Sequence, residues 1–266
     1  MKLINNKIFI LLFALAVITS CKKVINVTVN NATPVLVVQG NVTNQTGPYT
    51  VKLTSSVYYT EDNIFPPITG AVVKITDDST GITDVLTEQQ KGIYLTNTTV
   101  GAVNHTYHLY ISTGGKEYTS TSTMPKQVFL DSITFLTNTG FGQNVTNPLP
   151  NFQDPAGIYN AYRFIEWYNS KPSKQIFVFD DRLSDGKYIA RQLFNDSAYI
   201  QPGDTLQLEM QCIDKNVFNY FKELDGTDPT NGQPTSPANP TSNVSNGALG
   251  YFSAHTVQTK KKVFTK

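Results

Sequence analysis

The sequence predicts a mainly β protein, with an N-terminal antiparallel sandwich followed by a second antiparallel β domain that carries one short helix. Two observations lead to this fold class. Short segments in which apolar and polar residues alternate recur along the chain, and Gly, Asn and Asp stand at the breaks between them. Thr, Asn, Val and Tyr are also plentiful, which favours strands and turns over helices.

The first 21 residues have the composition of a bacterial lipoprotein export signal. Two lysines precede the apolar run 8–18 (IFILLFALAVI), which is too short to cross about 30 Å of hydrocarbon as a helix. Thr19 and Ser20 then lead into Cys21, and this site resembles the lipobox, where the cysteine receives a diacylglycerol before cleavage. We expect residues 1–20 to be removed and Cys21 to be lipidated; an ordinary secretory signal with an incidental cysteine is the alternative.

A lipid on Cys21 implies a membrane as a partner, and residues 21–34 then form the lipidated N-terminus and a spacer. Lipidation also leaves Cys212 without an intramolecular disulfide partner, so apolar packing has to hold the fold together. The chain has 21 Lys and Arg against 20 Asp and Glu, and this balance offers no basic surface for nucleic acid.

The first β domain is expected over residues 35–125. It begins with the apolar run 35–38, and alternating strands follow at 49–53, 71–76 and 106–111. In the last of these, Tyr107, Leu109 and Ile111 are expected to face inward. Residues 116–122 are polar and rich in Thr, which fits an edge strand.

The second domain is expected over residues 126–266. Strands are predicted at 128–136, 161–168, 175–179, 188–194, 205–213 and near 249–257, with a Gly/Asn/Pro-rich loop at 137–157. Segment 175–179 (QIFVF) is apolar on both faces, so we expect a central strand buried on both sides.

One segment of the second domain has helical spacing. Val217, Phe221 and Leu224 recur at this spacing between a capping Asp214 and a terminating Gly226, which predicts a helix at 214–224. Four prolines exclude regular structure from the loop 227–243 that follows. The loop is too long for a mere connector, so it is expected, with residues 246–252, to contribute to a partner or ligand contact. A surface loop with no such role is the alternative.

Two family resemblances add to this reading. Residues 67–77 (PITGAVVKITD), with 92–94 (GIY) and 107–109 (YHL), resemble the transthyretin-like domains related to carboxypeptidase regulatory domains, which implies a transthyretin-like or immunoglobulin-like sandwich for the first half. Over nearly the whole mature chain, residues 36–40 (LVVQG), 47–51 (GPYTV), 179–186 (FDDRLSDG) and 245–252 (SNGALGYF) resemble domain-of-unknown-function family 4249.

The second resemblance implies a place in the cell. Members of family 4249 are lipoproteins of Bacteroidota, often encoded beside TonB-dependent outer-membrane transporters, so it implies an outer-membrane location and such a transporter as partner. It supplies no catalytic residues. Surface-exported lipoproteins of this lineage tend to have acidic residues after the cysteine, whereas this chain has Lys22 and Lys23. Whether the body faces the periplasm or the outside is therefore open.

Few residues are candidates for metal binding, and no cofactor is predicted. His105 and His108 would face opposite sides of one strand, so they are not expected to share an ion. Asp180, Asp181 and Asp185 form a calcium candidate, because carboxylate oxygens at this spacing are ligands that Ca²⁺ accepts. The alternative is a solvated turn in which the aspartates cap backbone amides and Arg182 pairs with a neighbour.

No catalytic set is identifiable. Glu166 lies inside a predicted strand without an obvious partner, no serine lies in a Gly-x-Ser-x-Gly elbow, and Cys212 has no nearby histidine and is expected to be a buried, inert thiol. Four Asp-Ser/Thr-aliphatic tripeptides resemble an O-glycosylation signal of exported Bacteroidota proteins. Their hydroxyl residues are Ser79, Ser132, Ser197 and Thr205.

These observations predict a non-catalytic accessory or ligand-capture lipoprotein with a glycan, peptide or other nutrient as ligand, and the resemblance to family 4249 implies that it acts at a TonB-dependent transporter. A structural or adhesive surface lipoprotein is the alternative, and a glycan or peptide hydrolase is less favoured. Six aromatic residues are candidates for a binding platform or, equally, for the core: Tyr58, Tyr59, Phe65, Trp167, Tyr251 and Phe252.

Overall fold

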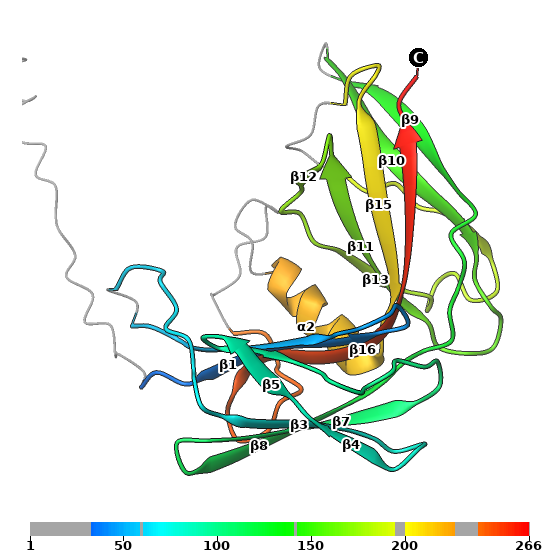
Figure 1. Ribbon diagram of the computed structural model, residues 1–266. Coiled ribbons are helices and arrows are strands. Elements are labelled where there is room, and N and C mark those ends of the chain that lie inside the picture. The colour runs from blue at the N-terminus through cyan, green and yellow to red at the C-terminus, as the bar shows by residue number, and fades with distance from the viewer. Residues whose placement is uncertain (1–32, 59–60, 141–142, 195–199, 227–238, 266) are drawn as a thin grey trace, which may run out of the picture. The chain divides into compact units, whose positions relative to one another are not determined.

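The computed structural model describes residues 33–58, 61–140, 143–194, 200–226 and 239–265 (Figure 1). This part of the chain is mainly β, with several antiparallel sheets and one short helix, as the sequence predicts. None of its helices is long and apolar enough to span a membrane. The signal segment, Cys21, Tyr59, Ser197 and residues 227–238 of the Pro-rich loop lie outside the described residues.

The strands form three sheets. A nine-stranded sheet has the order β12-β11-β15-β16-β1-β2-β6-β5, with β13 also paired to β11; the second sheet is β4-β3-β7-β8 and the third is β14-β10-β9. The strands of the first half are β1 (Leu36–Thr43), β2 (Thr50–Ser55), β3 (Val72–Asp77), β4 (Ile82–Val85), β5 (Thr87–Gln90), β6 (Ile93–Leu95), β7 (Thr106–Thr113) and β8 (Lys116–Thr123). Those of the second half are β9 (Ser132–Gly140), β10 (Gln143–Gln153), β11 (Ala161–Tyr168), β12 (Lys171–Pro172), β13 (Phe177–Asp180), β14 (Tyr188–Ala190), β15 (Thr205–Cys212) and β16 (Leu249–Val263).

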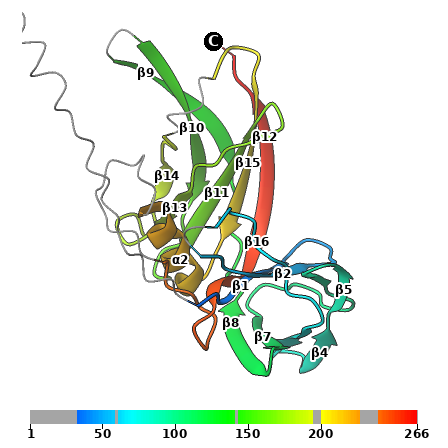
Figure 2. The same cartoon turned by 90° about the vertical axis from the view of Figure 1, so that its left-hand side faces the viewer.

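The first apolar core lies between β1, β2 and β6 on one side and the sheet β4-β3-β7-β8 on the other (Figure 2). Tyr107, Leu109 and Ile111 of β7 are at most 1% exposed, so the inward face predicted from their alternation is confirmed. β8 is the edge strand of its sheet, as its Thr-rich sequence predicts.

The second core lies between β11, β13 and β15 and the sheet β14-β10-β9. Phe152 of β10 is fully buried there, and its ring centroid is 4.8 Å from that of Tyr162 and 6.1 Å from that of Phe164, both on β11. Aromatic rings at these separations attract each other beyond the area that they bury.

Strand β16 belongs to both halves. Its residues 249–255 pair in parallel with β1, and its residues 256–263 pair antiparallel with β15. Phe252 and Ala254, together with Val244 and Ala248 just before the strand, are buried in the first core. The expected limits of 35–125 and 126–266 place this strand in the second domain, whereas it contributes to the first core as well.

Helix α2 (Lys215–Gly226) covers the face of the nine-stranded sheet opposite the second core. Val217, Phe218 and Phe221 are its buried residues. Asp214 caps it, because its Oδ1 accepts hydrogen bonds of 2.9 Å from the backbone N–H groups of Asn216 and Val217. The helix predicted at 214–224 is confirmed.

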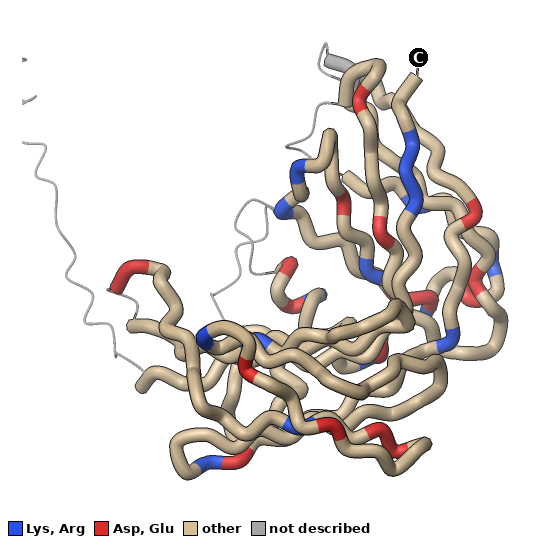
Figure 3. The backbone as a smooth tube through the Cα atoms, viewed as in Figure 1, with Lys and Arg blue, Asp and Glu red and all other residues tan. Residues whose placement is uncertain are grey.

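Three expectations for the second half are wrong in detail. The predicted loop 137–157 contains β10, in which Pro148 and Pro150 pair with β9. On the other side of β10, strand β14 pairs only with residues 151–153. No strand there needs a hydrogen bond from the backbone nitrogens of Pro148 and Pro150, which carry no N–H. Segment 175–179 is not central, because β13 pairs with β11 alone. The last strand, β16, does not end near residue 257 but continues through Lys260–Lys262 to Val263. Apart from these three lysines, acidic and basic residues are interspersed along the backbone (Figure 3).

Candidate functional site

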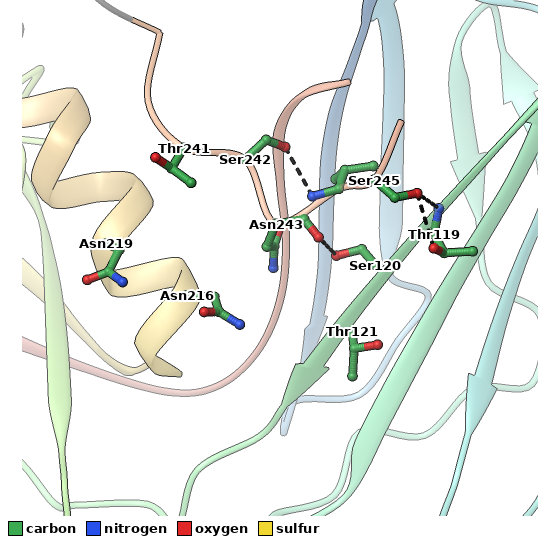
Figure 4. Close-up of a pocket in the computed structure, with 10 residues that line it drawn as sticks. Thr119, Ser120, Thr121, Asn216, Asn219, Thr241, Ser242, Asn243 and Ser245 are labelled. Atoms are coloured by element: carbon green, nitrogen blue, oxygen red, sulfur yellow. Dashed lines mark hydrogen bonds between the residues drawn. The ribbon is translucent and has the colours of Figure 1, made fainter. Parts of the chain in front are cut away.

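A polar groove lies where the edge strand β8 approaches helix α2 and the segment 241–245 (Figure 4). Its volume is about 460 Å³. The lining consists of residues 119–121 of β8, Asn216 and Asn219 of α2, and residues 241–245. All of these side chains except Val244 are hydroxyls or carboxamides, so no charged side chain of the described residues lines the groove.

The segment 241–245 is fixed by hydrogen bonds to two strands. Ser245 donates its backbone N–H to the Thr119 carbonyl at 2.8 Å, and its Oγ accepts the Thr119 N–H at the same distance. The carboxamide of Asn243 donates to the Phe252 carbonyl (2.7 Å) and accepts from the Phe252 N–H (2.9 Å). This wall is therefore part of the folded body.

Asp214 connects the other two walls. One carboxylate oxygen caps α2, and the other accepts a hydrogen bond from the hydroxyl of Ser122 on β8. Burial raises the pKa of Asp214 above its ordinary value, although the hydrogen bonds from Ser122 and from the helix amides act in the opposite direction. The carboxylate thereby holds the start of α2 against β8.

Three lining side chains are not used by the fold. The carboxamides of Asn216 and Asn219 and the hydroxyl of Thr241 make no hydrogen bond to any described residue, whereas Asn243 and Ser245 are fully engaged. Figure 4 shows Asn216 and Asn219 on α2, across the groove from residues 119–121 of β8. Carboxamides and hydroxyls both donate and accept hydrogen bonds. The groove can therefore hold a neutral polar ligand.

Two larger cavities have walls that adjoin residues outside the described part of the chain. One is lined by Phe194 and Gly226, which border the segments 195–199 and 227–238. The other is lined by Ile200, which borders 195–199. None of the residues that line the groove beside β8 directly adjoins an undescribed segment.

The aspartates of the predicted calcium candidate separate. Asp180 turns to Arg182, with 2.6 Å between Oδ2 and Nε. Asp181 and Asp185 instead meet Asp154, which follows β10, and ligand oxygens of these three residues lie within 4.8 Å of one another. The three carboxylates that the structure brings together therefore include Asp154, which the sequence did not indicate, in place of Asp180.

Hydrogen bonds account for much of this acidic cluster. Asp154 accepts from the Tyr162 hydroxyl and from the Gly186 N–H, and Asp181 accepts from the Asn160 N–H at 2.7 Å. Burial, together with the neighbouring charge of Asp154, raises the pKa of Asp181. Asp181 and Asp185 cap backbone amides as in the alternative interpretation, although Asp181 is buried rather than solvated. Calcium binding at Asp180, Asp181 and Asp185 stays a prediction.

A family model described as a domain of unknown function, DUF4249, matches residues 22–261. The chain belongs to this family. The match confirms the resemblance inferred from the four sequence motifs, and it covers both cores, the groove and all but the last two residues of β16. No curated protein matches the sequence.

The histidines of this DUF4249 chain each have a different neighbour. His105 Nδ1 lies 2.9 Å from a carboxylate oxygen of Asp77, and His108 Nε2 lies 2.6 Å from one of Asp78. His255 is buried beside Ser253, with 2.9 Å between Nδ1 and the serine Oγ. Burial, and to a lesser extent the positive charge of Arg163, lowers the pKa of His255 to about 3, so its ring is neutral at physiological pH.

Two candidates for chemistry are buried in the DUF4249 body. Cys212 is a free thiol at 3% exposure that accepts the Val128 N–H, and burial raises its pKa, which disfavours the reactive thiolate. The expectation of a buried thiol is confirmed. Glu166 of β11 is 1% exposed.

Two of the aromatic candidates belong to packed regions. Phe252 is fully buried in the first core, and Tyr251 packs on Phe221 of α2 with 4.9 Å between ring centroids. Phe65 is half exposed, and Tyr58 and Trp167 are half-buried. A binding platform that includes these three residues stays a prediction.

The modification candidates differ in access. Ser79 and Ser132 are exposed and Thr205 is half-buried, whereas Ser197 and the lipidation candidate Cys21 lie outside the described residues. O-glycosylation at the exposed serines stays a prediction.

Proposed function

We propose that this protein is a lipoprotein anchored in the outer membrane through Cys21, where it captures a neutral polar ligand for a TonB-dependent transporter without transforming it. The observation that carries the proposal is the groove beside β8. It presents side chains that can form hydrogen bonds and that the fold leaves unused, on walls fixed by Asp214 and Asn243.

Two features support the anchor. Cys21 follows a short apolar run and two small residues, as in a lipobox. The family match begins at residue 22, immediately after this cysteine. A lipid with two or three acyl chains would hold the body at the membrane permanently, because each buried methylene contributes about 0.8 kcal/mol.

The composition of the groove supports capture rather than chemistry. The described residues that line it include neither a carboxylate nor an imidazole that could act as acid or base. Its volume of about 460 Å³ lies within the range of roughly 300–1,000 Å³ that is usual for small-ligand sites.

The anchor is tested by labelling with palmitate. Cys21→Ala should abolish incorporation of the label, and the matched variant Cys212→Ala should retain it, because the Cys212 thiol is buried. Label that persists in Cys21→Ala would place the lipid elsewhere and refute the anchor.

Capture is tested in native outer membranes. The ligand and the transporter should co-purify with the wild-type protein, and the double variant Asn216→Ala with Asn219→Ala should lose the ligand while it retains its fold. Equal ligand recovery from both proteins would exclude the groove as the capture site.

The transporter contact needs a deletion that spares the groove. Residues 241–243 line the groove and hold β16, so removing the whole loop 227–243 would disturb the fold. Replacing only residues 227–238 with a short Gly/Ser bridge should leave folding intact and weaken co-purification with the transporter. Undiminished recovery of the transporter would remove the loop's role and leave the anchor standing.

A further inference from the structure

A second cavity lies in the first half of the chain, and its walls come from the turn that joins β3 to β4 and from the loop before β7. Its volume is about 250 Å³. Apart from Asp77 and His105, every described residue of the lining is Thr, Ile, Val or Ala, so methyl groups make up much of its surface. The lining comprises Asp77, Thr80, Ile82, residues 98–100, Ala102 and His105.

Two buried side chains hold the loop wall of this cavity. Asp84, which is 4% exposed, accepts hydrogen bonds of 2.8 Å from the backbone N–H groups of residues 97–99. Burial alone would raise the pKa of Asp84, but these hydrogen bonds outweigh it and lower the pKa. The hydroxyl of Tyr107 accepts from the Ala102 N–H at 2.8 Å and donates to the Val100 carbonyl at 3.0 Å. The wall is therefore formed before a ligand arrives, and binding need not order it.

The imidazole of His105 is fixed in one orientation. Its Nδ1 lies 2.9 Å from Asp77 Oδ2, and its ring stacks on that of Tyr107 with 6.4 Å between centroids. Burial would raise the pKa of Asp77, but hydrogen bonds from His105 and from the Ser79 N–H outweigh it and lower the pKa, so the carboxylate is ionised at neutral pH. An ionised carboxylate only accepts, which assigns the hydrogen of a neutral imidazole to Nδ1 and leaves Nε2 as an acceptor. This Nε2 bonds to no described residue, and the His105 side chain is 29% exposed.

These features define the ligand. The methyl-rich wall requires an apolar body, and His105 Nε2 requires a hydrogen-bond donor on that body. The negative charge of Asp77 disfavours an anion. A cation would lose hydration, and both carboxylate oxygens of Asp77 already accept hydrogen bonds. The volume of about 250 Å³ is below the roughly 300 Å³ at which small-ligand sites usually begin, so the cavity has room for a single ring.

We propose that this cavity binds a single phenol ring, whose O–H donates to His105 Nε2 while the ring packs on Ile82 and Val100. A phenol suits this acceptor because its O–H, with a pKa of about 10, is more acidic than that of an aliphatic alcohol and is the stronger donor. The ring belongs to a free small phenol or to a tyrosine side chain of a partner protein, since both present the same chemistry. The site is separate from the groove beside β8 and does not depend on capture there.

The test compares 4-methylphenol with toluene, which has the same ring and methyl group but no donor. Nitrogen-15 NMR of the full-length protein in detergent reports the imidazole directly, because the chain has only three histidines. A titration with 4-methylphenol should shift the His105 Nε2 resonance to saturation and leave those of His108 and His255 unchanged. Toluene should bind about fivefold more weakly, which corresponds to the loss of one hydrogen bond.

The capped tripeptide acetyl-Ala-Tyr-Ala-amide separates the two sources of the phenol. If it shifts the same resonance and binds more tightly than 4-methylphenol, the occupant is a tyrosine of a partner protein. If only 4-methylphenol binds, the occupant is a free phenol.

Variants locate the binding in this cavity. Val100 is 75% exposed at the cavity, so Val100→Asp should leave the fold intact and abolish binding of 4-methylphenol. Ile64→Asp is the matched control, because Ile64 is 76% exposed and lies outside the lining. His105→Phe keeps a ring beside Tyr107 but removes the acceptor, so this variant should bind 4-methylphenol and toluene equally.

Three results would overturn the inference. They are the lack of a saturable shift at millimolar 4-methylphenol, equal affinity of the wild type for toluene, and unchanged binding in a folded Val100→Asp variant. None of them bears on the proposed capture function, which concerns the groove beside β8 and is tested with its own variants.

Discussion

Replacing Asp214 by alanine removes the N-cap of α2 and the acceptor that joins the helix to β8. The lost cap costs about 1 kcal/mol. The hydroxyl of Ser122, which is 2% exposed, then has no acceptor, and an orphaned buried donor costs about 1–3 kcal/mol. We therefore expect the free energy of unfolding to fall by about 2–4 kcal/mol, which is a large share of the roughly 5–15 kcal/mol typical of a folded protein.

Replacing Asp214 by asparagine should cost less than replacing it by alanine. Asparagine caps helices as well as aspartate does, and its NH₂ group can donate to the Ser122 Oγ, but the Ser122 hydroxyl hydrogen then loses its acceptor as it does in Asp214→Ala. The substitution also removes a charge that burial disfavours, as the raised pKa of Asp214 indicates. We therefore expect the stability of Asp214→Asn at pH 7 to lie closer to that of the wild type than to that of Asp214→Ala.

Ionisation of Asp214 should make the free energy of unfolding depend on pH. The folded state holds the Asp214 proton more tightly than the unfolded state, whose pKa is about 3.9. As the pH rises from that value through the higher folded pKa, ionisation of Asp214 costs stability. The stability of the wild type relative to Asp214→Asn should therefore decrease over that interval.

Urea unfolding monitored by the fluorescence of the single tryptophan, Trp167, measures all three proteins at pH 4 and pH 7. The expected order at pH 7 places Asp214→Ala well below the other two. If Asp214→Asn falls as far as Asp214→Ala, the charge matters more than the hydrogen bonds, and the reasoning given for this residue is refuted.

Three further predictions concern other parts of the fold. Gly250→Ala should lose at least about 2 kcal/mol more stability than Gly203→Ala in the same urea assay. Both glycines have positive φ (91° and 98°), but only at Gly250 would the new Cβ overlap the Val38 carbonyl, so equal losses would contradict this reason. Asp181→Asn should raise the melting temperature at neutral pH, because burial and a neighbouring carboxylate raise the pKa of Asp181 and so make its charged form unfavourable. This gain in melting temperature should shrink as the pH falls through that pKa, and a gain that persists in acid would have another cause. Dithiothreitol should leave the melting temperature unchanged because Cys212 is a buried free thiol, and a marked fall would reveal a disulfide.

Local sequence patterns predicted those strands and the helix whose conformation is determined by residues close by in the sequence. Alternation in 106–111 identified the buried face of β7, and Asp214 and Gly226 indicated the ends of α2. The prolines of β10 misled the prediction, because a proline is tolerated wherever no neighbouring strand needs its N–H, and this depends on the reach of β14. The parallel pairing of β1 with β16 leaves no local signal.

The candidate sites depended on contacts that the sequence does not contain. Asp180 and Asp181 are adjacent but point to different neighbours, so their spacing alone did not identify the cluster with Asp154. In the sequence, nothing distinguishes Asn216 and Asn219 from other solvated residues on a helix face. They become groove residues only because Asp214 holds α2 against β8, nearly a hundred residues earlier in the chain.

The sharing of β16 sets the order in which this chain can mature. β1 lacks its parallel neighbour β16, and the first core lacks Phe252 and Ala254, until β16 has been synthesised. β16 lies more than a hundred positions downstream of β8. A polypeptide that emerges from a ribosome or a translocon N-terminus first therefore cannot complete its leading half while it is still emerging. Contacts this distant in sequence slow folding. Until β16 is available, one edge of β1 has unpaired backbone groups, and such an edge can pair with other chains.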